Sequence, residues 1–571
     1  MPHIGKKLIW RTGIAAALAA AAATGSAEAE RMVAAAHPLA AEAGMTALRN
    51  GGTAVDAAIA VQTVLTLVEP QSSGIGGGAF MLHLDGKTGE VTAWDGRETA
   101  PAAATEKLFL KPDGSPKKFF EAVVGGRSVG APGVLRMLSE AHKRFGRSPW
   151  ADGFTAAIHL SEQGFKVTPR LNFLLNRDPF LPKQAVAGRY FYDQNGKAHP
   201  VGYQLKNPEL AKTLSTIAAG GVDAFYSGPL ARRIVATAQG NQANPGLLTV
   251  QDLQNYQARE RPVICRPYRG YSVCGMPPPT SGGVTVLQIL GLLRGTDISK
   301  QEPGSADAVH LVAQASRLAY ADRALYLADP DFVPQPVEDL LDTNYLKSRA
   351  KAASIGADAF PSSPAKAGEM PMKKGLLDLA PAADLAQPST THFVIRDDQG
   401  NVVSMTSSVE NAFGSRLMVG GFLLNNQLTD FSFRPLKDGR QVANRAEAGK
   451  RPRSSMSPMI VKNGDGSFRL AVGSPGGSRI IAYVARTLVG VLDWNLPVQT
   501  AISMPNFANR NGGTDVELRT DTVGLAARLT GLGHSVKPRV LNSGLHGIEM
   551  VDGKLRGGAD PRREGIVLHE K

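Results

Sequence analysis

Apolar side chains that recur at helical spacing predict the first regular structure of the chain. Residues 54–67 repeat such side chains every three or four positions, and residues 38–49 form a second candidate helix that packs beside them. A glycine run, GIGGG at residues 74–78, leads into the strand candidate at residues 79–84. Because no Gly-Lys-Ser/Thr follows these glycines and no strand precedes them, they indicate a tight turn rather than a phosphate-binding loop.

The pattern changes twice after this start. Residues 133–342 alternate helical patterns with loops, whereas residues 357–389 are rich in Pro, Ala, Lys and Ser with weak periodicity, which is typical of an exposed linker. Directly afterwards, the β-branched and apolar runs at residues 390–395 and 401–406 flank a turn and predict a hairpin. A flexible segment therefore ends at the first residue of a core strand.

The N-terminus has the features of a secretory signal. Lys6, Lys7 and Arg11 precede an apolar run at residues 14–23, and AEA at residues 27–29 matches an A-x-A cleavage site. The apolar run is about half as long as the roughly 20 residues that span a bilayer. We therefore expect removal of this segment and a mature protein that is periplasmic or secreted.

Composition and charge indicate a globular protein and give no sign of nucleic-acid binding. At 571 residues, with 43% hydrophobic and 20% charged residues, the chain is typical of a globular protein with a large core. The formal net charge is +13, yet no basic run is interleaved with aromatics and no zinc-finger or RNA-binding signature is present. We expect no nucleic-acid partner, and a solvated basic face that an anionic envelope would attract.

The chain holds two cysteines, Cys265 and Cys274. If Arg269 and Gly270 form a two-residue hairpin turn, counting outward places Cys265 opposite Cys274 at a non-hydrogen-bonded position of the ladder. Thiols at such a position are close enough to bridge. In an exported protein this predicts a disulfide, and two buried free thiols are the alternative.

Thr390 stands at the junction of linker and hairpin. A threonine hydroxyl is a poor nucleophile without a base, and the residue's own α-amino group, with a pKa near ~7.7–8.0, can serve only when it is free. The hydroxyl must therefore first attack the carbonyl of Ser389, so that the peptide bond between these residues is cut through an ester. The string STTH at residues 389–392 is weak evidence alone, since a threonine at a strand start is usually structural.

Longer motifs strengthen this hypothesis. The small-subunit side of the chain resembles gamma-glutamyltransferases in TTH at 390–392, LNNQLTDFS at 424–432, RPRSSMSP at 451–458 and GSPGGSR at 473–479. The large-subunit side is similar to the family in HP at 37–38, NGGTAVDAA at 50–58, SGIGGG at 73–78, WDGRE at 94–98 and PPPTSGG at 277–283. The resemblance covers nearly the whole mature chain, and the linker matches least.

The resemblance implies which residues bind the α-carboxylate and the α-amino group of a glutamyl substrate. Arg97 would bind the α-carboxylate of a glutamyl group as a bidentate fork, with Ser454 and Ser455 on the other side of that carboxylate. Gln427 and Asp430 would hold the α-amino group. The alternatives without function are a surface ion pair for Arg97, a helix cap for Asp430 and solvated serines.

At the reacting end, Gly476 and Gly477 resemble the glycines whose backbone amides form the family's oxyanion hole, although a tight turn would also explain them. Thr391 and Ser408 correspond to hydroxyls that orient the nucleophile. Ser408 stands where the family more often has threonine, so a hydroxyl is kept.

Two departures from the family pattern bear on specificity. Glu410 occupies a position where many members carry an asparagine, and Asn411 follows it. A carboxylate there would strengthen ammonium binding or signal a changed acyl preference. Residues 431–450, which in several members include a lid loop with an aromatic residue, contain no tyrosine and look shortened. A more open site would let hydrolysis compete with transfer.

The fold that the resemblance implies is α+β, the four-layer αββα sandwich of N-terminal-nucleophile hydrolases. We expect a signal peptide at residues 1–29, a large subunit at 30–389 and a small subunit at 390–571 that share one core. The implied activity is hydrolysis and transfer of gamma-glutamyl groups from glutathione and similar amides to water, amino acids or dipeptides. No metal or organic cofactor is expected.

Two alternatives remain open from the sequence. An acylase for glutaryl or beta-lactam side chains would share fold and maturation, but its substrate lacks the α-amine, so Asp430 would be dispensable. An uncleaved, inactive envelope protein that binds peptides would remain a single chain.

Overall fold

A computed structural model describes residues 30–370, 379–382, 389–519 and 522–571. The predicted signal peptide and parts of the predicted linker lie outside the described residues. No helix in the described ranges is both long and apolar enough to cross a membrane.

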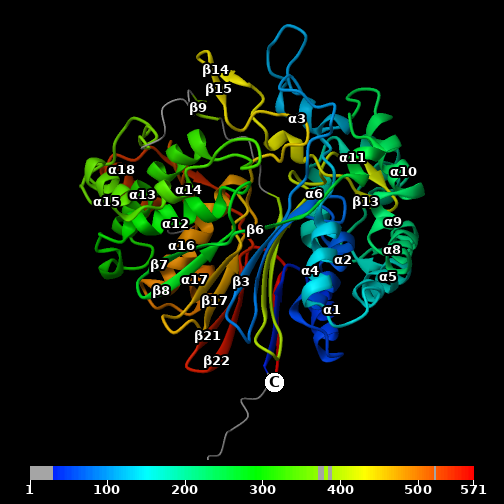
Figure 1. The fold of residues 1–571 in the computed structure, drawn as a ribbon, viewed down its shortest axis with the longest axis horizontal. Coiled ribbons are helices and arrows are strands. Elements are labelled where there is room, and N and C mark those ends of the chain that lie inside the picture. Colours follow the sequence, from blue (N-terminus) through cyan, green and yellow to red (C-terminus); the bar gives the residue numbers. More distant parts are fainter. Residues whose placement is uncertain (1–29, 371–378, 383–388, 520–521) are drawn as a thin grey trace, which may run out of the picture.

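Two stacked β-sheets form the centre of the molecule (Figure 1). Within the described residues, the first sheet has seven strands in the order β23 (Ile566–Glu570), β1 (Arg31–Ala35), β10 (Thr391–Arg396), β11 (Val402–Ser408), β2 (Gly78–Leu84), β3 (Val91–Gly96) and β6 (Arg259–Arg261). The second has six, in the order β22 (Lys554–Ala559), β21 (His546–Val551), β17 (Phe468–Gly473), β16 (Met459–Lys462), β8 (Tyr271–Gly275) and β7 (Ile264–Tyr268).

The side chains of the first sheet point alternately to its two faces, as the period of a strand requires. In β1, Val33 and Ala35 join the core beneath one helical layer, whereas Met32 and Ala34 join the core shared with the second sheet. Both faces are therefore buried. The sequence of a strand that is buried on both faces is a continuous apolar run rather than an alternation of polar and apolar residues.

Helices cover the outer face of each sheet, so the layers follow the order αββα (Figure 1). Over the first sheet lie α1 (Pro38–Arg49), α2 (Ala54–Val68), α4 (Val134–Phe145), α5 (Asp152–Gln163), α8 (Pro208–Gly220) and α10 (Gly228–Gln239). Over the second lie α12 (Gly282–Leu293), α13 (Ala306–Tyr326), α15 (Thr343–Ala352), α16 (Ile480–Leu492) and α17 (Val498–Ser503). The predicted fold class is confirmed.

Local signals explain where the first helices begin. Pro38 opens α1 after the N-cap His37, whose ring accepts a hydrogen bond from the Leu39 amide at 3.2 Å. Thr53 and Asp56 form a capping box at the start of α2. Both helices match the predicted ranges to within one residue. The strand β1, which precedes α1, was not anticipated, because its pattern is too short to separate from a helix.

The cysteine hairpin has the register that the sequence predicts. Tyr268 pairs with Tyr271 around the turn and Cys265 pairs with Cys274, and the structure joins the two sulfurs in a disulfide. The glycine run before β2 forms a turn, also as predicted.

The linker differs from its predicted exposure. Residues 361–364 are exposed, but Ala380 and Ser389 are buried. The strand β9 (Leu379–Ala380) pairs with β15 (Arg440–Val442), which forms a hairpin with β14 (Leu436–Lys437). The composition of a segment does not show that its backbone will add to the edge of a sheet.

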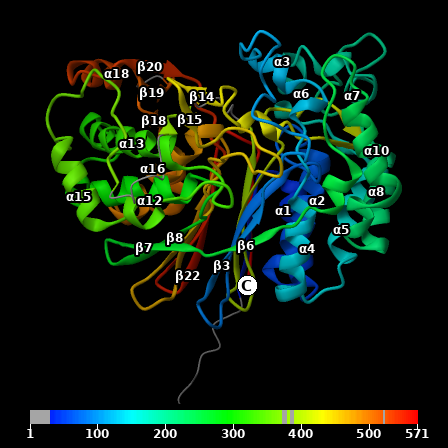
Figure 2. The ribbon, with the colours of Figure 1, turned by 45° about the horizontal axis from the view of Figure 1, so that its top comes forward.

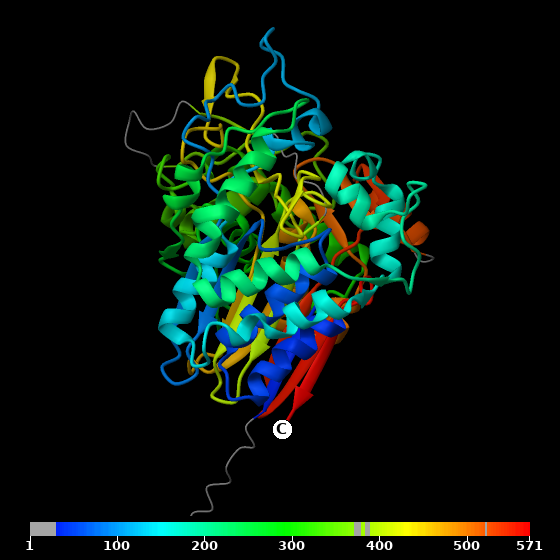
Figure 3. The same ribbon diagram turned by 90° about the vertical axis from the view of Figure 1, so that its right-hand side faces the viewer.

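The two chain ends of the described structure meet at one edge of the first sheet. β1 pairs antiparallel with β23, so the first and last strands lie side by side at the bottom of the molecule (Figure 3). The strand registers place the start of β10, which follows Thr390, at the other end of the sheet from the two chain ends.

Candidate active site

Thr390 directly precedes β10 and is buried. Its φ is +86°, a left-handed conformation that a β-branched residue rarely adopts. The Thr390 Oγ1 atom lies 2.9 Å from Ser408 Oγ, at the end of the neighbouring strand β11. The pairing of β10 with β11 thus brings a second hydroxyl to the predicted nucleophile.

The carbonyl group before Thr390 is held by a backbone amide. The Gly476 amide donates to the Ser389 oxygen at 3.1 Å. Gly476 has a φ of +136° and Gly477 a φ of +60°, and a Cβ at Gly476 would lie 2.7 Å from a ring carbon of Tyr483. Only glycine fits this turn, which precedes α16 and aims an N–H at the Ser389 carbonyl.

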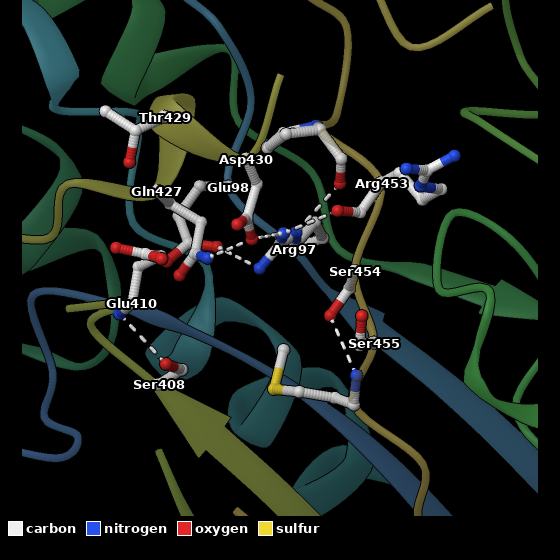
Figure 4. A network of polar contacts seen from close by, with 12 residues as sticks. Arg97, Glu98, Ser408, Glu410, Gln427, Thr429, Asp430, Arg453, Ser454 and Ser455 are labelled. Carbon is white, nitrogen blue, oxygen red and sulfur yellow. Dashed lines mark hydrogen bonds and ion pairs between the residues drawn. The ribbon is translucent and has the colours of Figure 1, made fainter. Parts of the chain in front are cut away.

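Arg97 extends from the end of β3 into a network that joins separate segments (Figure 4). Its Nη2 atom donates to Asp430 Oδ2 at 2.5 Å, and its Nε atom donates to the Pro452 carbonyl at 3.0 Å. Gln427 Nε2 donates to the same Asp430 oxygen at 2.8 Å. Gln427 and Asp430 lie together because they begin and end one turn of 3-10 helix, η4 (Gln427–Asp430).

Ser454 and Ser455 form the opposite wall. Ser454 Oγ accepts a hydrogen bond from the Met456 amide at 3.1 Å (Figure 4). Ser455 Oγ accepts one from Nη2 of Arg323 on α13 at 2.7 Å, and Arg323 Nε also donates to Ser281 Oγ. The buried Arg323 therefore holds Ser455 in position from the side of α13.

Glu410 follows Ser408 at the end of β11, with a φ of +78°. Its amide donates to Ser408 Oγ at 2.9 Å (Figure 4), and its carboxylate accepts a hydrogen bond from Asn426 Nδ2 at 2.5 Å. One residue thus links the hydroxyl beside Thr390 to the segment that carries Gln427.

Glu98, next to Arg97 in sequence, is fully buried. Its carboxylate lies 3.7 Å from Arg97 Nη1, and among the described residues neither of its oxygens has a hydrogen-bond partner. Burial raises the pKa of Glu98 to about 8, because the nearby guanidinium only partly offsets the loss of water.

The structure brings most of the predicted residues to one pocket. Its lining includes Arg97, Thr390, Ser408, Glu410, Gln427, Asp430, Ser454, Ser455 and Gly477. The free space is about 20 Å³, room for about one water molecule. Thr391 is not in the lining, and its hydroxyl has no hydrogen-bond partner in the described part of the chain.

Other residues of the site were not predicted. Met456 and Ile480 complete the lining, and Arg563 donates to the Thr390 carbonyl at 2.9 Å. Burial lowers the pKa of Arg563 to about 9. Met456 lies inside a quoted motif, but nothing in the sequence near Arg563 or Arg323 indicates that either would reach the site.

The four-layer fold, with a threonine at the start of a central strand, defines the class of N-terminal-nucleophile hydrolases. The family described as gamma-glutamyltranspeptidase matches residues 40–569. The chain belongs to this family.

Named relatives fall into two groups. A glutathione hydrolase proenzyme of Escherichia coli is 38% identical over 547 residues, which cover 93% of this chain and 90% of the relative. An acylase ACY 1 proenzyme of a Pseudomonas species is 35% identical over 554 residues, with 94% and 93% covered. The solved structure of a cephalosporin acylase from Bacillus halodurans superposes with a TM-score of 0.80 at 27% identity, over 95% of this chain and 96% of that chain.

Proposed function

We propose that the chain cuts itself between Ser389 and Thr390 and then hydrolyses or transfers gamma-glutamyl groups of glutathione and related amides through an acyl-enzyme on Thr390. The observation that carries the proposal is the hydrogen bond from the Gly476 amide to the Ser389 carbonyl, beside the Thr390 hydroxyl. An amide donor aimed at that oxygen stabilises the negative charge that develops on it during attack.

Self-cleavage uses groups already in place. The Thr390 hydroxyl attacks the Ser389 carbonyl carbon, its proton passes to the Thr390 nitrogen as the C–N bond breaks, and the acyl group is left on Oγ1 as an ester that water hydrolyses. The left-handed φ of Thr390 costs about 1–3 kcal/mol, and cutting the chain releases that constraint. The freed amine becomes the base for the next reaction.

In catalysis the same oxygen attacks the γ-carbonyl of a bound substrate. Ser408 holds the Thr390 hydroxyl, the free amine accepts its proton, and the amides of Gly476 and Gly477 receive the oxyanion. The leaving amine takes a proton and departs. Water or the amine of an acceptor then releases the acyl group.

The ion pair between Arg97 and Asp430 supports a zwitterionic substrate. An α-carboxylate would replace Asp430 as the partner of Arg97, and an α-ammonium would replace Arg97 as the partner of Asp430. The pocket of the uncut chain is too small for such a substrate, so Arg97 and Asp430 must separate and Ser389 must move away before it binds.

Two subunits, residues 30–389 and 390–571, and export through the N-terminal signal are parts of the same proposal. The basic, apolar and small-residue order of residues 1–29 supports export.

The second candidate is an acylase for glutaryl or beta-lactam side chains. The relatives and the solved structure with acylase names favour it. The carboxylates of Asp430 and Glu410 argue against it, because a glutaryl group carries no ammonium to pair with them.

Electrophoresis and an anilide assay test the main proposal. The wild-type protein should give two chains, the smaller one starting at Thr390 by Edman sequencing, and should release nitroaniline from gamma-glutamyl-p-nitroanilide. Thr390→Ala should remain one chain without activity. A wild-type protein that stays uncut would point to the inactive binding protein, and preference for the glutaryl anilide would point to the acylase.

A further inference from the structure

A second cavity, of about 730 Å³, lies beside the catalytic pocket. It is bounded by the β14 and β15 hairpin, by α13 and by the segment before α3 (Phe119–Val123). Figure 2 shows the hairpin over the middle of the molecule, between α13 and α3.

The lining of this cavity carries an unusual charge. Five cationic side chains from four segments contribute to it, and the described lining residues include no carboxylate; the cations are Lys117, Arg323, Arg434, Lys437 and Arg510. Low-dielectric walls of one sign of charge raise the local concentration of the opposite charge.

Two of these cations connect the cavity to the catalytic pocket. Arg323 donates to Ser455 Oγ, which lines that pocket. Arg510 donates to Ser478 Oγ at 2.7 Å, and Ser478 directly follows Gly476 and Gly477, whose amides are proposed to receive the oxyanion. Arg323 therefore contacts a residue that lines the catalytic pocket, and Arg510 contacts the residue that follows Gly477, which also belongs to that lining.

The other three cations are available to a ligand. Within the described ranges, the Lys117, Arg434 and Lys437 side chains form no ion pair, and Arg434 and Lys437 are exposed. Phe119 and Phe433 add apolar surface between them. Such a surface suits a peptide with a terminal carboxylate.

We propose that this cavity binds the carboxylate of the peptide on the far side of the scissile amide, either the leaving dipeptide of the donor or an incoming acceptor. This inference rests on the proposed function and adds a specificity: donors and acceptors that carry a free carboxylate are preferred over neutral ones.

The test compares charged and neutral substrates with the mature enzyme. The triple variant Lys117→Gln, Arg434→Gln, Lys437→Gln should raise KM for glutathione roughly tenfold at low salt, since each exposed charge contributes a few-fold at most. The effect should shrink in 0.5 M salt, because screening shortens the reach of these charges. The kcat/KM for gamma-glutamyl-p-nitroanilide, whose leaving group is neutral, should stay within about twofold. Lys554→Gln, on β22, is the matched control.

The acceptor arm uses the anilide as donor, with glycylglycine or its C-terminal amide as acceptor. A selective loss with glutathione assigns the cavity to the leaving peptide, and a selective loss with glycylglycine assigns it to the acceptor; either result supports the proposal. Equal KM values for variant and wild type in both arms, or an equal loss with the neutral anilide, would overturn it. A wild-type enzyme inactive on every gamma-glutamyl substrate would instead refute the proposed function.

Discussion

At the scale of single residues, the site consists of charges and strained groups that the surrounding fold holds in place. Thr390 and Glu410 both have positive φ values, and they flank the hydroxyl of Ser408 from two strands. Strain of this kind persists only where the neighbouring structure fixes the backbone, and it is concentrated at functional sites. Asp430 and Glu98 both lie beside Arg97, but they differ in their contacts. Asp430 accepts a hydrogen bond from Arg97, whereas neither oxygen of Glu98 has a hydrogen-bond partner among the described residues.

Asp430→Asn should separate the two candidate activities. Loss of a charged contact to the substrate ammonium costs about 1.5–3 kcal/mol, which lowers kcat/KM for gamma-glutamyl anilide roughly ten- to hundredfold. The glutaryl anilide has no ammonium, so its rate should change much less. The exposed Asp438→Asn variant serves as control. Equal losses on both anilides would contradict an ammonium-binding role.

Glu98 should make stability depend on pH. Its folded pKa of about 8 lies above the value of 4.5 expected when unfolded, so the folded protein holds a proton that the unfolded chain releases between these values. The stabilisation is complete below pH 4.5 and is lost as the pH rises towards 8. Relative to Glu98→Gln, the wild-type Tm should therefore fall by several degrees between pH 5 and pH 8. Parallel Tm profiles of the two proteins would show that Glu98 is already ionised in the fold, and Glu90→Gln controls for surface charge.

At the scale of elements, the turn before β2 fixes the position of Ser408. A Cβ at Gly77 would lie 2.1 Å from the Ser408 carbonyl oxygen, and one at Gly76 would lie 2.1 Å from the Leu423 carbonyl oxygen. The glycines thus let one turn pack directly against two backbone segments of the predicted small subunit.

Gly77→Ala should slow self-cleavage, and it should do so more than the substitution of an exposed glycine by alanine. The new methyl group must displace the end of β11, and with it the Ser408 hydroxyl that holds Thr390. We expect accumulation of uncut chain on electrophoresis over hours, with far-ultraviolet circular dichroism like that of the wild type. Gly295→Ala is the control, because a Cβ added at Gly295 would meet no other atom within 4 Å. Normal cleavage in Gly77→Ala would show that the turn does not position Ser408.

For the molecule as a whole, the proposed cleavage site lies at the start of a sheet strand rather than between domains. β10 and β11, which follow Thr390, pair with β1 and β2, which precede it, and β16 pairs with β8 in the second sheet. The two parts share both β-sheets and the core between them.

The two fragments should therefore remain together after cleavage. Size-exclusion chromatography of the cut protein in buffer should give one peak that contains both chains, and separation should require denaturant, because parting them would break strand ladders and expose the core. The uncut Thr390→Ala protein should elute at the same volume. Separate elution of the fragments without denaturant would be inconsistent with the shared sheets.

Local patterns were enough to predict the first helices, the hairpin at Thr390 and the register of the two cysteines, because capping residues, β-branched runs and a two-residue turn act over a few positions. Through family motifs it also placed nine lining residues in one pocket and predicted the αββα class. Three features could be seen only in the folded molecule: Arg323 supports Ser455, Arg563 holds the Thr390 carbonyl, and a cationic cavity adjoins the site. Those contacts join segments far apart in the chain, and their energies depend on burial and direction, which no local pattern records.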